Sequence, residues 1–257
     1  MSGGTREGER SPSSNPASGA DSVRVPFIYR LIQIVSAWCL RRLAGVHVEG
    51  LQNVPASGPC ILVANHQSAL DPVLLQSSCP RTVYTMTKST QFASPFFRVF
   101  LGWTRTFPTR RYRVDPQSVR ILLRLLGEGE AVCLYPEGER SWDGVLQPLR
   151  KGAVRVLLHD GVPVIPVGIE GTYDVLPRWA SRPRRGYAMY LRFGAPLDLG
   201  VHRTRAEREA ALPEAEELLR SVLRKLSGEV SREAERVSNG RGLEMTGPST
   251  AARNLLG

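Results

Sequence analysis

The sequence predicts an α/β fold: a single domain with a mostly parallel mixed sheet flanked by helices, preceded by an amphipathic helix. Two observations carry this prediction. Short apolar and β-branched runs alternate along the chain with longer segments of helical periodicity, an order typical of a largely parallel sheet. The chain has 257 residues, of which 42% are hydrophobic, so one domain can bury a sizeable core.

The elements of this fold follow one another in a clear order. The predicted strands are Val46–Val48, Cys60–Ala64, Thr82–Met86, Ala131–Tyr135, Val162–Gly168 and Tyr187–Phe193. The predicted helices are Asp71–Ser78, Pro95–Leu101, Pro116–Gly127, Gly152–Asp160 and Arg205–Lys225. Pro163 and Pro166 lack the N–H that a sheet ladder needs, so we expect the strand that contains them to be irregular or near an edge. Ligands of such sheets bind beyond the carboxyl ends of the strands, which directs attention to the residues there.

Composition divides the chain into four parts. Residues 1–24 and 238–257 are poor in bulky apolar side chains and rich in small and polar ones, so we expect them to be disordered tails. Residues 25–45 contain the amphipathic helix, and residues 46–237 form the α/β domain.

The segment 25–45 has the character of a membrane element without the length of a membrane span. Its apolar core is shorter than the ~20 residues that a span requires, and Arg30 interrupts it. Spacings of four, four and three place a set of apolar residues on one helix face: Phe27, Leu31, Val35 and Trp38. With Arg41 and Arg42 also present, such a helix suits the surface of an anionic bilayer. An ordinary amphipathic helix packed on the domain explains the pattern equally well.

The charge and the cysteines narrow the choice of partners and compartment. The net charge of +10 favours an anionic partner: nucleic acid, a membrane surface or a phosphorylated ligand. Nucleic-acid binding predicts aromatic residues between basic ones, a pattern that segment 178–192 approaches while most basic residues are scattered elsewhere, so we expect no nucleic-acid partner. The four cysteines form no CxxC pair, which argues against a zinc or redox motif. Cys60 and Cys133 lie in apolar runs, as buried free thiols of a reducing compartment do.

The cluster with the clearest chemistry follows the predicted strand Cys60–Ala64. In the stretch VANHQSALDP, His66 and Asp71 are five positions apart. A tight loop would let the Asp71 carboxylate bind one ring nitrogen of His66, leaving the other nitrogen as a general base and stabilising the imidazolium that forms. Two alternatives remain open. Asp71 caps the helix that begins at Pro72, or Ser68 is a nucleophile, although it lacks a GxSxG elbow.

Arginines and a glutamate form a second set of candidates. These residues are Arg110, Arg111 and Arg113 in FPTRRYR, and Glu137, Gly138 and Arg140 in PEGERS. Two guanidinium groups from separate loops can bind one phosphomonoester, because each presents a planar fork to the phosphate oxygens. Gly138 permits a turn that other residues resist. Glu137 either accepts a hydrogen bond from a substrate hydroxyl or pairs with an arginine to hold the loop.

Taken together, these motifs resemble the glycerolipid acyltransferase family, typified by the 1-acyl-glycerol-3-phosphate acyltransferases. The family's first block, NHxxxxD, matches Asn65, His66 and Asp71, and YPEGERS is similar to its third block, [FY]PEGTRS. LGWTRTFPTRR looks like the second block, whose functional arginine falls at Arg111 or, in a second alignment, at Arg110. VPVIPV looks like the fourth block. The resemblance covers roughly residues 46–199, with the blocks in the family's order.

The resemblance implies transfer of a fatty acyl group from acyl-CoA or acyl carrier protein to the free hydroxyl of a lysophospholipid. The acceptor expected first is 1-acyl-glycerol-3-phosphate; another lysolipid acceptor and a catalytically silent lipid-binding protein are the alternatives. The implied catalytic residues are His66, as general base, and Asp71, as its orienting partner. The implied substrate-binding residues are Lys88, Arg110, Arg111, Glu137, Gly138 and Arg140. The acyl thioester is a co-substrate, and no cofactor or metal ion is implied.

Membrane-borne substrates imply a protein that docks on a membrane. The resemblance therefore favours the membrane-surface interpretation of the helix in 25–45 and predicts a peripheral or monotopic protein on the cytoplasmic face. The stretch PFFRVFLGW, Pro95–Trp103, is expected to form a second insertion surface or a wall of the acyl-chain tunnel. Ordinary core packing is the alternative for this stretch.

Glu139 departs from the family pattern, because it stands where Thr is usual. A carboxylate that pointed toward a bound phosphate would repel it. Either Glu139 faces solvent, or the acceptor carries no phosphomonoester.

Overall fold

The computed structural model describes residues 26–110, 115–158 and 161–233, so the predicted tails 1–24 and 238–257 lie outside the described residues. The strands are β1 (Gly45–Glu49), β2 (Cys60–Ala64), β3 (Val83–Lys88), β4 (Thr106–Thr109), β5 (Ala131–Leu134), β6 (Val164–Glu170) and β7 (Ala188–Phe193). The helices are α1 (Phe27–Leu43), α2 (Asp71–Ser78), α3 (Pro95–Trp103), α4 (Pro116–Gly127), α5 (Lys151–Leu157), α6 (Thr172–Val175) and α7 (Arg205–Leu226). Two short 3-10 helices are η1 (Leu51–Asn53) and η2 (Ser89–Ala93).

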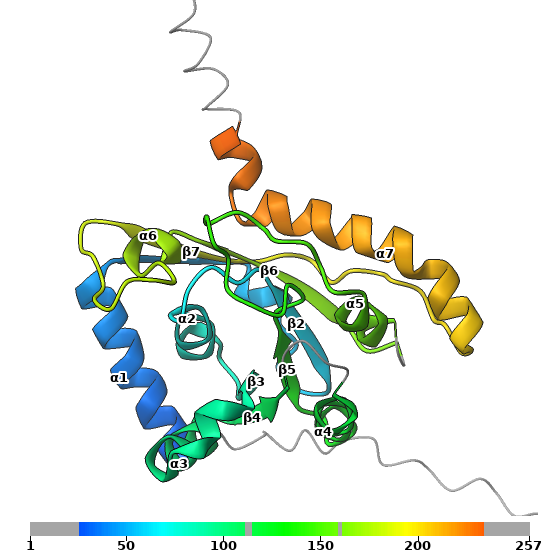
Figure 1. Cartoon of the computed structure of the whole chain (residues 1–257), viewed down its shortest axis with the longest axis horizontal. Coiled ribbons are helices and arrows are strands. Elements are labelled where there is room, and N and C mark those ends of the chain that lie inside the picture. Colours follow the sequence, from blue (N-terminus) through cyan, green and yellow to red (C-terminus); the bar gives the residue numbers. More distant parts are fainter. Residues whose placement is uncertain (1–25, 111–114, 159–160, 234–257) are drawn as a thin grey trace, which may run out of the picture.

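These strands form one seven-stranded sheet in the order β1-β7-β6-β2-β5-β3-β4 (Figure 1). Of its pairings only that of β6 with β7 is antiparallel, which confirms the predicted mostly parallel mixed sheet. Each strand predicted from the sequence is present, with ends that differ by at most two residues. Because β2, β3, β5 and β6 run parallel to one another, their carboxyl ends meet at the same edge of the sheet.

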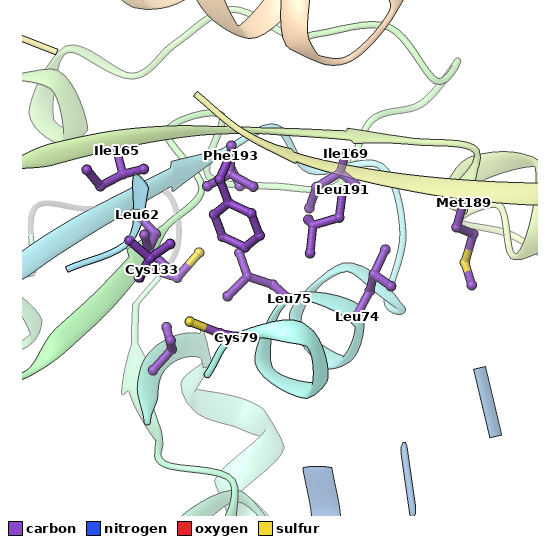
Figure 2. Packing of buried hydrophobic residues seen from close by; sticks show 14 of the residues in the cluster. Leu62, Leu74, Leu75, Cys79, Cys133, Ile165, Ile169, Met189, Leu191 and Phe193 are labelled. Carbon is purple, nitrogen blue, oxygen red and sulfur yellow. The ribbon is translucent and has the colours of Figure 1, made fainter. Parts of the chain in front are cut away.

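Helices cover both faces of the sheet (Figure 1). On one face, Leu75 of α2 packs into a cluster with Leu62 of β2 and residues of β6 and β7 (Figure 2). On the other face, the neighbouring residue Ile61 packs with Val154 of α5 and Leu219 of α7. Successive side chains of β2 thus point into two different cores, which explains why CILVA is an unbroken apolar run.

The structure corrects the prediction for the strand that contains two prolines. β6 lies inside the sheet, between β7 and β2, rather than at an edge. The Pro166 carbonyl accepts a hydrogen bond from Gly194 N–H (2.8 Å), just beyond the end of β7. The nitrogen and the carbonyl of one strand residue point to the same side of the strand. The Pro166 nitrogen, which carries no hydrogen, therefore also points to the β7 side, and no hydrogen bond between β2 and β6 is lost. Gly194 leaves room for the ring, since a Cβ there would lie 2.9 Å from Pro166 Cγ.

Strand β4 is an addition to the predicted elements. It contains Pro108, which argues against a strand when only the sequence is considered. In the fold β4 is the outermost strand and pairs with β3 alone, with Pro108 opposite Thr87. An outer strand tolerates a residue without an N–H. The predicted helix Gly152–Asp160 appears as α5, and its last two predicted residues lie outside the described residues.

Candidate active site

The candidate active site lies where the loops after β2 and β5 leave the carboxyl edge of the sheet. These strands are parallel neighbours, so the two loops emerge side by side. Ser141 N–H donates to the carbonyl of His66 (2.7 Å), and His66 N–H donates to Glu137 Oε1 (2.6 Å). The Asn65 amide anchors the first loop to β6 by exchanging two hydrogen bonds with the backbone of Ile169 (2.8 and 2.7 Å). The first and third blocks of the resemblance therefore form one structural unit.

The contact predicted between His66 and Asp71 is present. Asp71 Oδ2 lies 2.8 Å from His66 Nδ1. With Nδ1 donating to the carboxylate, Nε2 is the nitrogen that can accept a proton. The His66 side chain is 12% exposed, so it is reachable from solvent while most of its surface is covered. The pair has the geometry of a general base with a fixed tautomer.

Asp71 is fully buried and accepts four hydrogen bonds. Besides His66, its Oδ2 accepts the backbone N–H groups of Gln67 (2.6 Å) and Ser68 (2.8 Å), and its Oδ1 accepts the hydroxyl of Thr172 (2.6 Å). A carboxylate held in this way cannot rotate without leaving buried donors unpaired, so it fixes the imidazole. Its backbone partners precede α2, so the carboxylate does not cap that helix. The Ser68 hydroxyl donates to the Leu176 carbonyl (2.7 Å), which directs it away from nucleophilic attack.

Two further residues contact the pair: Tyr135, which is the first residue of YPEGERS and had no predicted role, and Thr172, which none of the motifs contains. The Tyr135 ring stacks on the imidazole of His66, with ring centroids 4.2 Å apart and planes inclined by 25°. Thr172 supplies the hydroxyl that bonds Asp71. Tyr135 directly follows β5, and Thr172 lies two positions after β6. The rule that ligand-binding residues follow the carboxyl ends of parallel strands is the signal that could have found both.

Glu137 is buried and joins the loop after β5 to its surroundings. Its two oxygens accept the backbone N–H groups of His66 (2.6 Å) and Gln147 (2.7 Å). Burial raises the pKa of the Glu137 carboxyl to about 8, although these two hydrogen bonds act in the opposite direction. Both oxygens already have partners within the protein. The geometry thus favours a role in holding the loops, through backbone amides rather than through the arginine considered from the sequence.

Gly138 forms the turn next to Glu137. Its φ of 75° lies in the region that favours glycine. A Cβ at this position would also collide with the side chain of Arg150, whose Nε–H donates to the Glu137 carbonyl (3.0 Å). Gly138 therefore permits both the turn and the contact that stabilises it.

A cleft of about 520 Å³ opens beside His66. Residues from α1, α2, β3, η2, α3 and β4 line it, together with Tyr135 and Arg140 of the loop after β5. Lys88, at the end of β3, also lines this cleft, so two of the predicted substrate-binding cations, Lys88 and Arg140, face it.

The predicted arginines after β4 are not placed at the cleft. Arg110 is exposed and is not among the described residues that line the cleft; its backbone N–H donates to Asp115 (2.8 Å). Arg111 and Arg113 lie outside the described residues.

Glu139 neither lines the cleft nor simply faces solvent. Its Oε2 accepts a hydrogen bond from Arg178 Nη1 at 3.0 Å, and its Oε1 lies 3.7 Å from Arg150 Nη2. The Glu139 carboxylate is only 20% exposed and is matched by positive charge. The reason for doubting a phosphomonoester acceptor is therefore removed.

Two helices beside the cleft expose apolar side chains. The face of α1 predicted from the residue spacing points away from the domain: Phe27, Leu31, Val35 and Trp38 are all exposed. Its opposite face packs on the domain, where the Gln33 amide donates to the carbonyl of Gln76 in α2 (2.7 Å). None of the residues of α3 is buried, which excludes ordinary core packing for that helix. Residues of both helices line the same cleft, and α3 lies next to the start of α1 (Figure 1).

Within 26–110, 115–158 and 161–233, none of the helices combines the length and apolarity needed to cross a bilayer. In the same ranges, the His, Cys, Asp and Glu side chains form no group of three that could hold a metal ion.

A mostly parallel sheet carries the histidine–aspartate pair at its carboxyl edge, beside a cleft that bears Lys88 and Arg140. A family model described as Acyltransferase matches residues 45–170, which include both loops. Over this region the chain is similar to the glycerolipid acyltransferases.

Three relatives show the extent of the similarity. The chain is 35% identical over 135 residues to a chloroplastic 1-acyl-sn-glycerol-3-phosphate acyltransferase of Brassica napus, a match covering 51% of this chain and 38% of that protein. It is 29% identical over 174 residues to the 1-acyl-sn-glycerol-3-phosphate acyltransferase of Bacillus subtilis, covering 66% and 84% of the two chains. The crystal structure of the 1-acyl-sn-glycerophosphate acyltransferase PlsC from Thermotoga maritima superimposes with a TM-score of 0.64 at 26% identity, covering 77% and 79%. The match spans 38% of the length of the Brassica napus protein and 38% of that of a chloroplastic 1-acyl-sn-glycerol-3-phosphate acyltransferase of Arabidopsis thaliana.

Proposed function

We propose that this protein is an O-acyltransferase that moves a fatty acyl group from an acyl thioester to the free hydroxyl of 1-acyl-glycerol-3-phosphate, giving phosphatidic acid. The observation that carries the proposal is the His66–Asp71 pair, a base of fixed tautomer beside a cleft that also bears Lys88 and Arg140. The names of the plant and bacterial relatives support the same acceptor. The thioester is carried by CoA or by acyl carrier protein.

In the proposed reaction, His66 acts first as a base and then as an acid. Nε2 takes the proton of the acceptor hydroxyl as the hydroxyl oxygen attacks the thioester carbonyl carbon. The buried Asp71 carboxylate stabilises the imidazolium that forms. The tetrahedral intermediate then collapses, the carbon–sulfur bond breaks, and the thiolate takes the proton from Nε2. A new ester and a free thiol result, with His66 neutral again and without a covalent enzyme intermediate or a cofactor.

Cations of the cleft position the acceptor in this scheme. Lys88 and Arg140 bind the phosphomonoester, since both line the cleft that contains His66. Arg111 is proposed as a further phosphate ligand on the strength of its place in the second block alone. Holding the acceptor hydroxyl and the thioester side by side supplies a large share of the rate, because it removes the entropy cost of bringing two reactants together.

The exposed apolar faces of α1 and α3 dock the protein peripherally on the anionic, cytoplasmic face of a membrane in this proposal. Ile32 of α1 and Phe100 and Leu101 of α3 line the cleft, so a lipid can pass from the bilayer to His66 along apolar side chains. Arg30, Arg41 and Arg42 are exposed on α1 and supply the charge that anionic headgroups attract.

Transfer of labelled acyl groups to a panel of lysolipids in detergent micelles tests the proposal, with acyl-CoA and acyl carrier protein as alternative donors. Wild type should acylate 1-acyl-glycerol-3-phosphate, and His66→Ala should lose at least about 10³-fold in kcat. His47→Ala is the matched control, because His47 is exposed on β1 and does not line the cleft.

Two outcomes would change the proposal. Acylation of lysolipids that lack a phosphomonoester, and of those alone, would keep the chemistry and replace the acceptor. The absence of transfer to every acceptor from either donor would favour a lipid-binding protein without catalytic activity.

A further inference from the structure

We propose that Arg178 is a positioning residue that keeps the acceptor site selective for phosphomonoesters by neutralising Glu139. The inference rests on the proposed function and adds a residue that none of the sequence motifs contains. Glu139 occupies a position where the family usually has Thr, and it immediately precedes Arg140, which lines the cleft. An uncompensated carboxylate at this point would oppose the binding of a dianionic headgroup.

The contacts of Arg178 fix both the charge and the shape of this loop. One nitrogen, Nη1, donates to Glu139 Oε2 (3.0 Å) and also to the backbone carbonyl of Arg140 (2.9 Å). Its guanidinium lies over the ring of Trp142, with Cζ 3.5 Å from the ring centroid. Arg178 therefore contacts three of the four residues from Glu139 to Trp142, although it lies in a segment far along the chain.

Burial makes this pair more important than an ordinary surface ion pair. The side chains of Arg178 and Glu139 are each only 20% exposed, so water screens their attraction incompletely. Arg150 also lies near Glu139 but is farther away, at 3.7 Å, and is 43% exposed, so it compensates the carboxylate less well than Arg178 does. Loss of Arg178 removes the cation that is hydrogen-bonded to Glu139 and should make the charge of this loop more negative.

This charge should act on the headgroup rather than on the chemical step. The His66 side chain is held by Asp71, and Asp71 by Gln67, Ser68 and Thr172, none of which Arg178 contacts; the segment 139–142 that Arg178 contacts meets His66 at its backbone carbonyl, through Ser141 N–H. A dianionic phosphomonoester feels a nearby carboxylate more strongly than a zwitterionic headgroup does. Arg178→Ala should consequently raise KM for the first kind of acceptor and change kcat little.

A double-mutant cycle tests the inference with two acceptors, 1-acyl-glycerol-3-phosphate and zwitterionic lysophosphatidylcholine. Arg178→Ala should raise KM for the phosphomonoester about tenfold, with kcat within about twofold of wild type. In the Glu139→Thr background, the same Arg178→Ala change should raise KM by no more than about twofold, because there is no carboxylate left to neutralise. Arg182→Ala, which removes an exposed arginine of the same segment, is the matched control.

The outcomes separate the inference from the proposed function. An equal rise in KM for Arg178→Ala in both Glu139 backgrounds, or a fall in kcat together with the melting temperature, would assign Arg178 a purely structural role and overturn the inference. An unchanged KM for Arg178→Ala would overturn it as well, with the proposed function intact because wild type is active. Wild type that acylates neither lipid would refute the proposed function, and the inference with it.

Discussion

The cleft beside His66 has two walls that are built in opposite ways. The wall formed by the loops after β2 and β5 is polar and closely bonded; Asp71 alone accepts four hydrogen bonds there, and Glu137 accepts two from backbone amides. The wall formed by α1 and α3, called the apolar wall, also carries apolar side chains that do not line the cleft and are largely uncovered: Trp38 is 63% exposed and Phe96 is 76% exposed.

The difference shows where each wall obtains its stability. In the polar wall, contacts among distant parts of one chain determine every position, so each change should act on catalysis or on folding. In the apolar wall, the protein supplies few contacts for the side chains that it exposes, and an external surface of lipid would supply the rest. Changes to the two walls should accordingly affect different measurements.

The largest effect is expected at the centre of the polar wall. Asp71→Asn keeps one oxygen for the three donors that share Oδ2, namely His66 and the backbone amides of Gln67 and Ser68, and turns its NH₂ toward the Thr172 hydroxyl, which must then accept. The negative charge that stabilises the His66 imidazolium is lost, so we expect kcat to fall about 10³–10⁴-fold. Initial rates with 1-acyl-glycerol-3-phosphate check this, beside Asp198→Asn, which changes an exposed carboxylate near β7. Activity near that of the control would mean that Asp71 does not orient the base.

The apolar wall should respond in membrane binding rather than in chemistry. Trp38→Ser combined with Phe96→Ser removes two exposed side chains from α1 and α3, and should weaken binding to anionic vesicles about tenfold or more. Vesicle sedimentation measures the binding, and a short-chain soluble acceptor should show kcat within about twofold of wild type. Val201→Ser, at a valine that is 71% exposed and does not line the cleft, is the control. Equal vesicle binding by all three proteins would remove α1 and α3 as the docking surface.

A smaller effect is expected where an aromatic ring supports the base. Tyr135 contacts His66 through its ring, so Tyr135→Phe should keep kcat within about threefold of wild type, whereas Tyr135→Leu should lower it about tenfold. Initial rates measure the difference, and the melting temperature of each variant distinguishes it from a loss of folded protein. Equal kcat for the two variants would leave the stack without a role in catalysis.

The last effect concerns stability rather than rate and follows from the burial of Glu137. The pKa of its carboxyl rises from 4.5 to about 8 on folding. Between these values the folded state keeps a proton that the unfolded state has released, so the free energy of unfolding falls as pH rises, by at most about 1.4 kcal/mol per pH unit. Glu137→Gln cannot ionise and should flatten this decline. Urea unfolding in steps between about pH 5 and 8 checks it, and parallel slopes for the two proteins would show that Glu137 is ionised throughout.

Most of the fold could be predicted from the sequence because its signals are local. β-branched runs such as Cys60–Ala64 mark buried strands, and helical periodicity marks α2, α4 and α7 whatever their neighbours are. The predictions that failed concern strands with prolines. Pro166 is tolerated inside the sheet because β7 ends beside it, and Pro108 is tolerated because β4 is the outermost strand. Neither fact is encoded near the proline.

The candidate site divides in the same way. His66, Asp71 and the PEGERS loop were visible in the sequence because their motifs are short and follow strands. Thr172 and Arg178 were not, and Tyr135 was visible only as the first residue of YPEGERS, without its role. Each acts on a residue that only the order of strands brings near: Thr172 on Asp71, Tyr135 on His66 and Arg178 on Glu139. The environment of Glu139 is the clearest case. The sequence shows an acidic residue at a position usual for Thr, and only tertiary contact with Arg178 decides that its charge is compensated.

By itself, the sequence determined the class of fold, the two polar loops and the apolar face of α1, because each depends on the spacing of residues along one segment. The tertiary structure decided which hydrogen bonds hold Asp71, which cation meets Glu139, and that α3 contributes no residue to the core. These depend on distances between segments far apart in the chain, which follow from how the whole sheet is ordered and covered.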